Sequence, residues 1–101
     1  MLAEFSVTPI GAGESVAEYV AEVVKIVDES GLDYRTNAMG TVVEGEFDEV
    51  IGLIARCHKA TRARCKRVST IIKIDDRDGA EGALTAKTAS VERILGRRLR
   101  T

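Results

Sequence analysis

Residues 68–75 read VSTIIKID, a nearly continuous β-branched run that predicts a central strand of a sheet. Upstream of this run, apolar residues at helical spacing from Phe47 to about Lys66 predict an amphipathic helix, and the cations near its end complement the helix dipole. The stripe of this helix consists of Phe47, Val50, Ile51, Ile54, Cys57 and Thr61. Downstream of the run, another predicted helix carries on one stripe Leu84, Thr88, Val91, Leu95 and Leu99.

The first half of the chain also alternates between strand and helix. Leu2–Ile10 (LAEFSVTPI) alternates apolar with polar residues, which predicts a half-buried strand. In the helix that follows, Ser15 and Glu18 have the spacing of a capping box, and Gly31 provides a C-terminal stop. Two short strand-like runs, Tyr34–Ala38 and Gly40–Glu44, then predict a hairpin.

This order of elements predicts an α+β fold of the ferredoxin-like type. Strand, helix, two strands, helix and strand form the split βαβ arrangement, with one helix added at the C-terminus. A chain of 101 residues suits a single domain, which we expect to cover residues 1–101. In this fold the four strands form one antiparallel sheet whose one face is covered by both main helices. The C-terminal helix, a sister subunit or a ligand is expected to cover the other face.

The two halves of the chain carry opposite charges, although the net charge is only −1. Residues 1–50 contain eleven acidic and two basic residues, a balance of −9, whereas residues 51–101 contain five acidic and thirteen basic residues, a balance of +8. The predicted topology places the acidic first helix beside the basic second helix, so much of this charge should cancel locally. The remaining cations are expected to meet an acidic surface of a neighbouring subunit. Chief among them are the arginines of the last helix, Arg93, Arg97, Arg98 and Arg100.

Several classes of function lack the residues that they need. The sequence contains no run of roughly 18 apolar residues and no secretory leader, so we expect a cytoplasmic protein with no membrane partner. A single histidine and the absence of a Cys-x-x-Cys spacing predict no metal site. Cys57 and His58 are neighbours on a helix, so their side chains diverge and form no catalytic dyad. With no other catalytic constellation in view, we predict a protein that is not an enzyme.

RNA binding is an alternative, because the ferredoxin-like sheet is also the scaffold of an RNA-recognition module and a basic stretch ends the second main helix. That module stacks bases on aromatic residues of its sheet. Here Phe5 is the only aromatic residue of the corresponding strands, and by alternation it lies on the core side. We therefore do not expect nucleic acid to be a partner.

Alternation along the predicted strands mixes polar groups with apolar ones. Thr41 and Val43 share one face of the hairpin, whereas Val42 and Glu44 share the other. On the later strand, one face presents Ser69, Ile71, Lys73 and Asp75. Such a mixture suits a small, polar, partly aromatic ligand. An ordinary solvent-facing or subunit-facing sheet explains the same pattern, so both interpretations remain open.

Five segments, in this order, resemble the YkoF-like thiamine-binding protein family: the opening strand ending in PIGAG, then SVAEYVAEVVKIVDESGLDY, AMGTVVEGEFDEV, RVSTIIKIDDR and KTASVERIL. The most specific parts are MGTVVEGE and STIIKIDDR. The resemblance implies a ferredoxin-like domain that associates through its sheets, commonly as a dimer of dimers and thus a homotetramer. It also implies binding of thiamine or its hydroxymethylpyrimidine part without catalysis and without a cofactor.

The chemistry of an aminopyrimidine then selects candidate residues. Its ring nitrogens need donors such as Thr41 or Ser69, and its exocyclic amine needs an acceptor, for which Glu44 is preferred to Asn37. Met39 offers an adaptable apolar wall, and Ser6 and Thr8 are secondary candidates. Lys73, Asp75 and Arg77 form either an ion-pair cluster or further ligand contacts. Glu44→Gln is expected to weaken binding more than Lys73→Met. The alternative function is a structural or regulatory assembly module without a ligand.

Overall fold

Four antiparallel strands form one sheet in the order β2-β3-β1-β4, and three helices accompany it. This architecture comes from a computed structural model that describes residues 1–13 and 16–101. The elements are β1 (Leu2–Pro9), α1 (Ala17–Glu29), β2 (Asp33–Asn37), β3 (Gly40–Glu44), α2 (Phe47–Arg62), β4 (Val68–Asp75) and α3 (Ala83–Leu95). The predicted ferredoxin-like α+β fold is confirmed.

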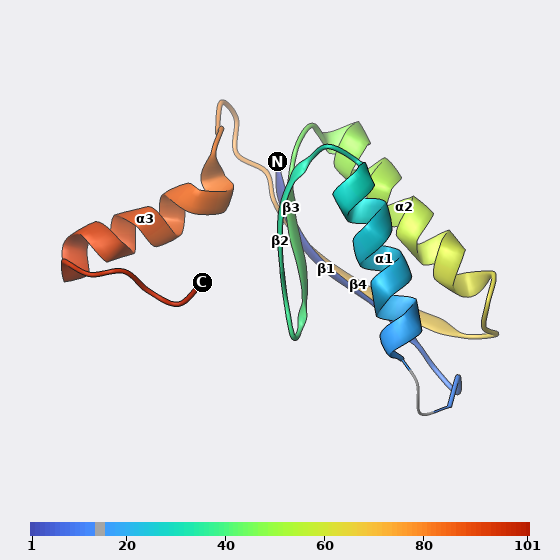
Figure 1. The fold of residues 1–101 in the computed structure, drawn as a ribbon. Coiled ribbons are helices and arrows are strands. Elements are labelled where there is room, and N and C mark those ends of the chain that lie inside the picture. Colours follow the sequence, from blue (N-terminus) through green and yellow to red (C-terminus); the bar gives the residue numbers. More distant parts are fainter. Residues whose placement is uncertain (14–15) are drawn as a thin grey trace.

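Helices α1 and α2 pack side by side on one face of the sheet, and α3 lies on its other side (Figure 1). Alternate residues of the two central strands, Ala3 and Phe5 on β1 and Val43 on β3, are buried beneath the helices. Val27 of α1 and Val50 of α2 complete this core from above. The core therefore lies wholly between the sheet and α1 and α2, and it depends on aliphatic packing.

The predicted position of the 68–75 strand in the sheet is wrong. Its bounds match β4, but β4 is an edge strand that pairs with β1 alone, whereas β1 and β3 occupy the centre. Three of its isoleucines are 43 to 67% exposed: Ile71, Ile72 and Ile74. A β-branched run reports the preference of the residues for extended backbone, and that preference does not distinguish a central strand from an edge strand.

Both main helices deviate slightly from their predicted patterns. The predicted capping box involves Ser15, which lies outside the described residues. Helix α1 begins at Ala17 and ends at Glu29. The predicted stop, Gly31, follows two residues later and has a left-handed φ of 80°. In α2 the buried stripe includes Leu53, whereas Phe47 is 51% exposed. Phe47 is the first residue of α2, so no preceding turn of the helix lies beside it.

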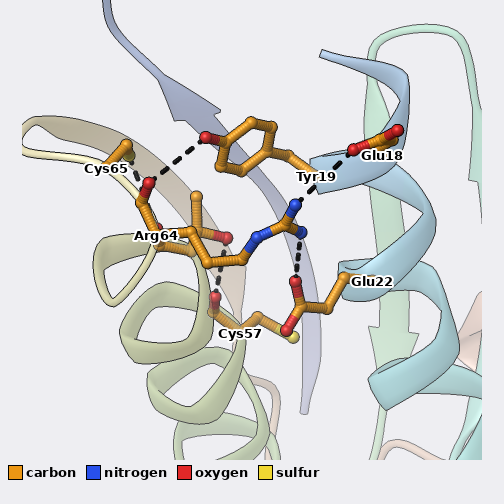
Figure 2. A network of polar contacts seen from close by, with 7 residues as sticks. Glu18, Tyr19, Glu22, Cys57, Arg64 and Cys65 are labelled. Atoms are coloured by element: carbon orange, nitrogen blue, oxygen red, sulfur yellow. Dashed lines mark hydrogen bonds and ion pairs between the residues drawn. The ribbon is translucent and has the colours of Figure 1, made fainter. Parts of the chain in front are cut away.

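Arg64, just beyond α2, holds the two main helices together at one end (Figure 2). Its guanidinium lies 2.7 Å from Glu22 and 3.6 Å from Glu18, both on α1. It also stacks 4.6 Å from the ring centroid of Tyr19, whose hydroxyl donates a hydrogen bond to the Arg64 carbonyl at 3.3 Å. The expected local cancellation between the acidic first helix and the basic second helix is confirmed at this end.

The C-terminal helix does not cover the sheet of its own chain. Helix α3 meets the rest of the fold near its first turn and then extends away from the sheet (Figure 1). None of its thirteen residues, all of them described, is buried. Of the predicted stripe, Leu99 follows the helix, and its backbone N–H donates a hydrogen bond to Glu92. The chain's own C-terminal helix therefore does not cover the open face of the sheet.

Candidate functional site

The β2–β3 hairpin turns through Ala38 and Met39 at the same end of the molecule as the start of α1 (Figure 1). The Asn37 side-chain oxygen accepts a hydrogen bond of 2.7 Å from the Met39 backbone N–H, which fixes the turn. The position after the turn requires glycine, Gly40, because the hairpin passes close to β1 there. A Cβ at this position would lie 2.7 Å from the Phe5 carbonyl oxygen. The Met39 side chain is 86% exposed at the tip.

A hollow of about 170 Å³ opens between this hairpin tip, β1 and α1. It is smaller than the roughly 300 to 1,000 Å³ of typical small-molecule pockets, so it suits one small ring. Its apolar wall comes mainly from Phe5 and from Val20, Val23 and Val24 of α1. Its polar lining includes Ser6, Thr8, Thr36, Asn37 and Thr41. We call this space the hairpin hollow.

One edge of β1 borders the hairpin hollow without a partner strand. The pairing of β1 with β3 ends at Phe5, which lies opposite Thr41, whereas its pairing with β4 continues to Pro9. Among the described residues, the β3 side of Ser6–Thr8 therefore has no neighbouring strand. Backbone N–H and C=O groups along such an edge are donors and acceptors for a ligand, as in strand addition.

Five of the predicted ligand-binding residues line the hairpin hollow: Ser6, Thr8, Asn37, Met39 and Thr41. Thr41 is 4% exposed, and its hydroxyl lies 3.3 Å from that of Thr36, so it forms the floor of the hollow. Asn37 uses its side-chain oxygen within the turn, which leaves its amide N–H₂ as a donor. The hairpin hollow is therefore where the structure brings the predicted polar residues together.

Glu44, the preferred acceptor in the sequence analysis, lies at the opposite end of β3. Its two carboxylate oxygens accept hydrogen bonds from the backbone N–H groups of Ala83 at 2.9 Å and Leu84 at 3.2 Å. Glu44 thus caps the N-terminus of α3, which has a left-handed glycine, Gly82, in place of a capping side chain. A second space of about 370 Å³ lies here, lined by Glu44, Asp75 and Arg77 among others.

The predicted cluster of Lys73, Asp75 and Arg77 has a different central pair. The Asp75 carboxylate lies 2.7 Å from the Lys87 ammonium of α3. This hydrogen bond and the Lys87 charge lower the pKa of Asp75, and Arg77 and Lys73 contribute only through their nearby charges. The pair therefore attaches α3 to β4. Ser69 lies apart from both spaces, opposite Thr8 and exposed on the open face of the sheet.

The thiol and the imidazole that are adjacent in sequence serve separate structural contacts. Cys57 is fully buried, its Sγ faces the Val23 carbonyl at 3.9 Å, and burial raises the pKa of its thiol to about 11. The His58 ring nitrogen Nδ1 instead lies 2.7 Å from the Thr70 hydroxyl. The predicted divergence of the two side chains is confirmed, and a protonated buried thiol is a poor nucleophile.

Within residues 1–13 and 16–101, no three His, Cys, Asp or Glu side chains come together as a metal-binding group. None of the helices in these ranges combines the length and the apolar character needed to cross a bilayer.

Residues 3–92 match the family model described as thiamine-binding protein. The chain belongs to this family. Among its relatives, the UPF0045 protein Mb1933 of Mycobacterium bovis is 48% identical over 96 residues, which cover 94% of each chain. The UPF0045 protein MJ1052 of Methanocaldococcus jannaschii is 34% identical and covers 90% of this chain and 91% of its own length.

Solved structures agree with the fold of this thiamine-binding family member. The crystal structure of MJ1052 superposes with a TM-score of 0.82 over 89% of this chain and 93% of that one. A Thermotoga maritima protein, TM0486, named as a candidate for thiamine biosynthesis or salvage, has a TM-score of 0.79 over 89% of this chain and 96% of its own. At 20% identity, TM0486 supports the fold alone.

Several residues that shape these spaces were not predicted from the sequence. Val20 and Val23 of α1 repeat at helical spacing with Val27, which is typical of a core stripe, and this periodicity gives no sign that the stripe also walls a hollow beside the hairpin. Thr36 alternates onto the same side as Thr41, so a fixed hairpin register would have found it. Lys87 pairs with Asp75 across a loop whose path no local pattern determines.

Proposed function

We propose that this protein binds thiamine or its hydroxymethylpyrimidine part without transforming it, as an oligomeric carrier or sensor in the cytoplasm. The observation that carries the proposal is the hairpin hollow, which combines an aliphatic wall, hydroxyl and amide groups, and an unpaired strand edge. Its lining residues among those described carry no charge. A neutral pyrimidine suits such a lining better than the cationic thiazolium of thiamine, because burying a charge without a partner is costly.

Along one edge the aminopyrimidine has a donor, its exocyclic amine, beside an acceptor, the adjacent ring nitrogen, and an unpaired strand edge also presents donors and acceptors side by side. We infer that the ring inserts between Val20 and the hairpin, with its hydrogen-bonding side toward Ser6–Thr8. The Asn37 amide is placed to donate to a ring nitrogen, and the exposed Met39 to close over the ring. The volume of about 170 Å³ leaves the thiazolium outside the hollow, toward solvent.

Isothermal titration calorimetry with thiamine and with hydroxymethylpyrimidine tests the proposal. Val20→Phe should fill the hollow from the α1 side and lower the affinity for both ligands at least tenfold. Lys73→Met, on the open face of the sheet, is the matched control and should leave both affinities unchanged. No heat from folded wild-type protein at millimolar ligand would refute thiamine-class binding.

Glu44→Gln separates the two places where the structure puts the predicted residues. If the pyrimidine binds in the hairpin hollow, this change at the base of α3 should alter the affinity much less than Val20→Phe does. If the acceptor is Glu44, as predicted from the sequence, Glu44→Gln should have the larger effect, and Lys73→Met a smaller one. The second result would move the proposed site to the base of α3.

Two surfaces support the proposed self-association. The outer edge of β4 pairs with no strand among the described residues, and it carries exposed isoleucines, a feature that natural proteins usually cover or disrupt. The open face of the sheet adds Ile71, which is 67% exposed. The free thiols Cys57 and Cys65 are compatible with the reducing cytoplasm.

The same exposed isoleucines favour a second candidate function, an assembly module without a small ligand. Sedimentation velocity distinguishes the two functions when it is combined with calorimetry. A stable oligomer whose titration with either ligand gives no heat would favour the assembly module. Heat that Val20→Phe abolishes, with the oligomer intact, would favour ligand binding.

A further inference from the structure

The first two turns of α1, which wall the hairpin hollow, are held by little packing of their own. Val20, Val23 and Val24 contribute to this wall, and Val20 is 48% exposed. The first buried residue of the helix is Val23, in its second turn. The N-cap residue, Val16, is apolar and offers no side-chain cap. Contacts outside the core are therefore needed to fix where this wall lies.

Arg64, just beyond α2, supplies contacts to these same two turns (Figure 2). Its guanidinium binds the carboxylate of Glu22 at 2.7 Å and that of Glu18 at 3.6 Å, and it stacks on the Tyr19 ring. At about 100° per residue, Glu18, Tyr19 and Glu22 lie on one side of α1 and the three wall valines on another. Arg64 thus holds the wall of the hollow from the side that faces away from the ligand.

The backbone of Arg64 is attached to the buried end of α2. Its N–H donates a hydrogen bond of 3.0 Å to the carbonyl of Thr61, a residue that is 2% exposed. The Thr61 hydroxyl donates to the Cys57 carbonyl at 3.0 Å, and the Tyr19 hydroxyl donates to the Arg64 carbonyl at 3.3 Å. This series of contacts connects the first turns of α1 to the core of the molecule.

The ion pairs of Arg64 should respond to ionic strength, because their side chains reach solvent. The exposed fraction is 40% for Arg64, 38% for Glu22 and 76% for Glu18. Salt screens pairs of this kind, and the screening length falls from about 10 Å at 0.1 M to about 3 Å at 1 M. The described lining of the hairpin hollow carries no charge. Inside the hollow, salt therefore has no ion pair of these residues to weaken.

We propose that Arg64 is a positioning residue: its contacts with α1 set the distance between this helix and the hairpin tip, and thereby the affinity of the hairpin hollow for a small uncharged ring. The inference rests on the proposed function, because it concerns the same hollow. It makes ionic strength a regulator of binding. The affinity for a neutral ligand falls as salt rises, since salt weakens the contacts that hold the wall.

Calorimetric titration of the full-length protein with hydroxymethylpyrimidine tests this role. Arg64→Met removes the charge from a side chain that is 40% exposed, so the variant should fold. Its dissociation constant should be about fivefold higher than that of wild type, the effect of a surface pair of the stronger kind. Arg62→Met is the matched control, because it removes the same charge at the same end of α2, where Arg62 donates to the Cys65 carbonyl at 3.2 Å. Its affinity should equal that of wild type.

Two further readouts separate positioning from a general loss of stability. Raising sodium chloride from about 0.1 to about 1 M should weaken hydroxymethylpyrimidine binding roughly twofold more in wild type than in Arg64→Met, which has no pair left to screen. Arg64→Glu should weaken binding more than Arg64→Met does, because it repels Glu18 and Glu22. Adding Glu22→Arg to Arg64→Glu should restore most of the affinity, since the two charges are then exchanged.

Three results would overturn the positioning role and leave the proposed function standing. They are equal affinities of wild type and Arg64→Met, equal salt dependence of the two, and failure of Glu22→Arg to restore binding in a variant whose circular dichroism is unchanged. No heat from wild type would instead refute the proposed function, and the role of Arg64 toward a ligand with it.

Amide hydrogen exchange in residues 17–24, measured without ligand, tests the hold on α1 independently of the proposed function. Exchange there should be faster in Arg64→Met than in Arg62→Met, because the first variant alone releases the start of the helix. Equal exchange in the two variants would overturn the inference at its first step.

Discussion

Gly40 is the residue at which the hairpin comes closest to β1, and it gives a sharp test of the fold around the hairpin hollow. In Gly40→Ala the new methyl group would lie 2.7 Å from the Phe5 carbonyl oxygen, and that oxygen belongs to a central strand that cannot easily move. We expect the free energy of unfolding to fall by about 1 to 3 kcal/mol, as in overpacked cores. Urea denaturation followed by circular dichroism measures it.

Gly52 of α2 is the matched control for Gly40. A methyl group there meets no atom within 4 Å, and the residue lies inside a helix. Gly52→Ala should therefore raise the free energy of unfolding by about 0.5 to 1 kcal/mol, because alanine loses less conformational freedom in a helix than glycine. Equal effects of the two substitutions would contradict the close approach of the hairpin to β1.

Cys57 should make stability depend on pH in the alkaline range. Its thiol has a pKa of about 11 in the folded chain against an ordinary value of 9.0, so between these pH values the unfolded chain binds fewer protons than the folded one. The free energy of unfolding should therefore fall as pH rises from 9 toward 11, by about 1.4 kcal/mol per unit at most.

Cys57→Ala isolates this contribution from other groups that titrate in the same range. Urea titrations of wild type and variant at pH 8 and pH 10.5 should show wild type losing more stability than Cys57→Ala over the interval. Identical losses would mean that the thiol ionises as readily in the folded chain as in the unfolded chain.

At the scale of elements, Glu44 couples β3 to α3. The carboxylate bonds with the Ala83 and Leu84 N–H groups hold the first turn of a helix that has no other side-chain cap and no buried residue. Glu44→Ala should lower the local opening free energy of α3 by about 1 kcal/mol, the usual effect of losing an N-terminal cap. Amide hydrogen exchange in residues 83–95 should then be about fivefold faster.

Glu81→Ala is the control for Glu44, since Glu81 is an exposed acid beside the same turn with a similar charge. Its effect on exchange in α3 should be small. Exchange in β1 and β3 should stay the same in both variants, because the hydrogen bonds between these strands do not involve α3. Equal acceleration by the two variants would assign the effect to general electrostatics and not to capping.

Helices and strands whose two faces differ in polarity were predictable from the sequence. Which elements lie next to one another in the sheet was harder to predict. The alternation in Leu2–Ile10 and the spacing of Val50, Ile54 and Cys57 led to the correct fold, because each of these segments buries one face against the other. The VSTIIKID strand was assigned to the centre and lies at the edge, since β-branched residues suit both positions. Strand position depends on long-range pairing that local preference does not encode.

The candidate site was partly predictable for the same reason. Asn37, Met39 and Thr41 were chosen for their chemistry, and the hairpin brings them together at one hollow. Glu44 comes from the same strand, but its carboxylate binds a helix that starts 39 residues later in the chain. The pattern of one strand cannot report such a contact. A residue's chemistry was therefore easier to predict than the partner that uses it.

At the scale of the whole molecule, the divided charge of the sequence becomes two separate features. Between α1 and α2, acid and base meet within the chain through Arg64 with Glu18 and Glu22. At α3 they remain apart, with an acidic base and a basic tip at opposite ends of one helix. The first arrangement joins the two core helices, whereas the second keeps the opposite charges separated along α3.

The core and α3 should also separate in folding. Among the residues that the structure describes, the buried hydrophobic ones lie between Ala3 and Cys57, and β4 completes the sheet by Asp75. A chain ending at Gly79 should therefore fold, with dispersed amide signals for β1 to β4 in a two-dimensional NMR spectrum. Because α3 buries little surface against the sheet, the urea m-value should change little on its removal.

Val27→Ala in the full-length chain provides the contrast, because the Val27 side chain is fully buried in the core. This change should lower the free energy of unfolding by about 2 kcal/mol, since it leaves a cavity. Removal of α3 should cost less than that, because no residue of α3 is buried. A shortened chain that is unfolded would mean that α3 belongs to the core.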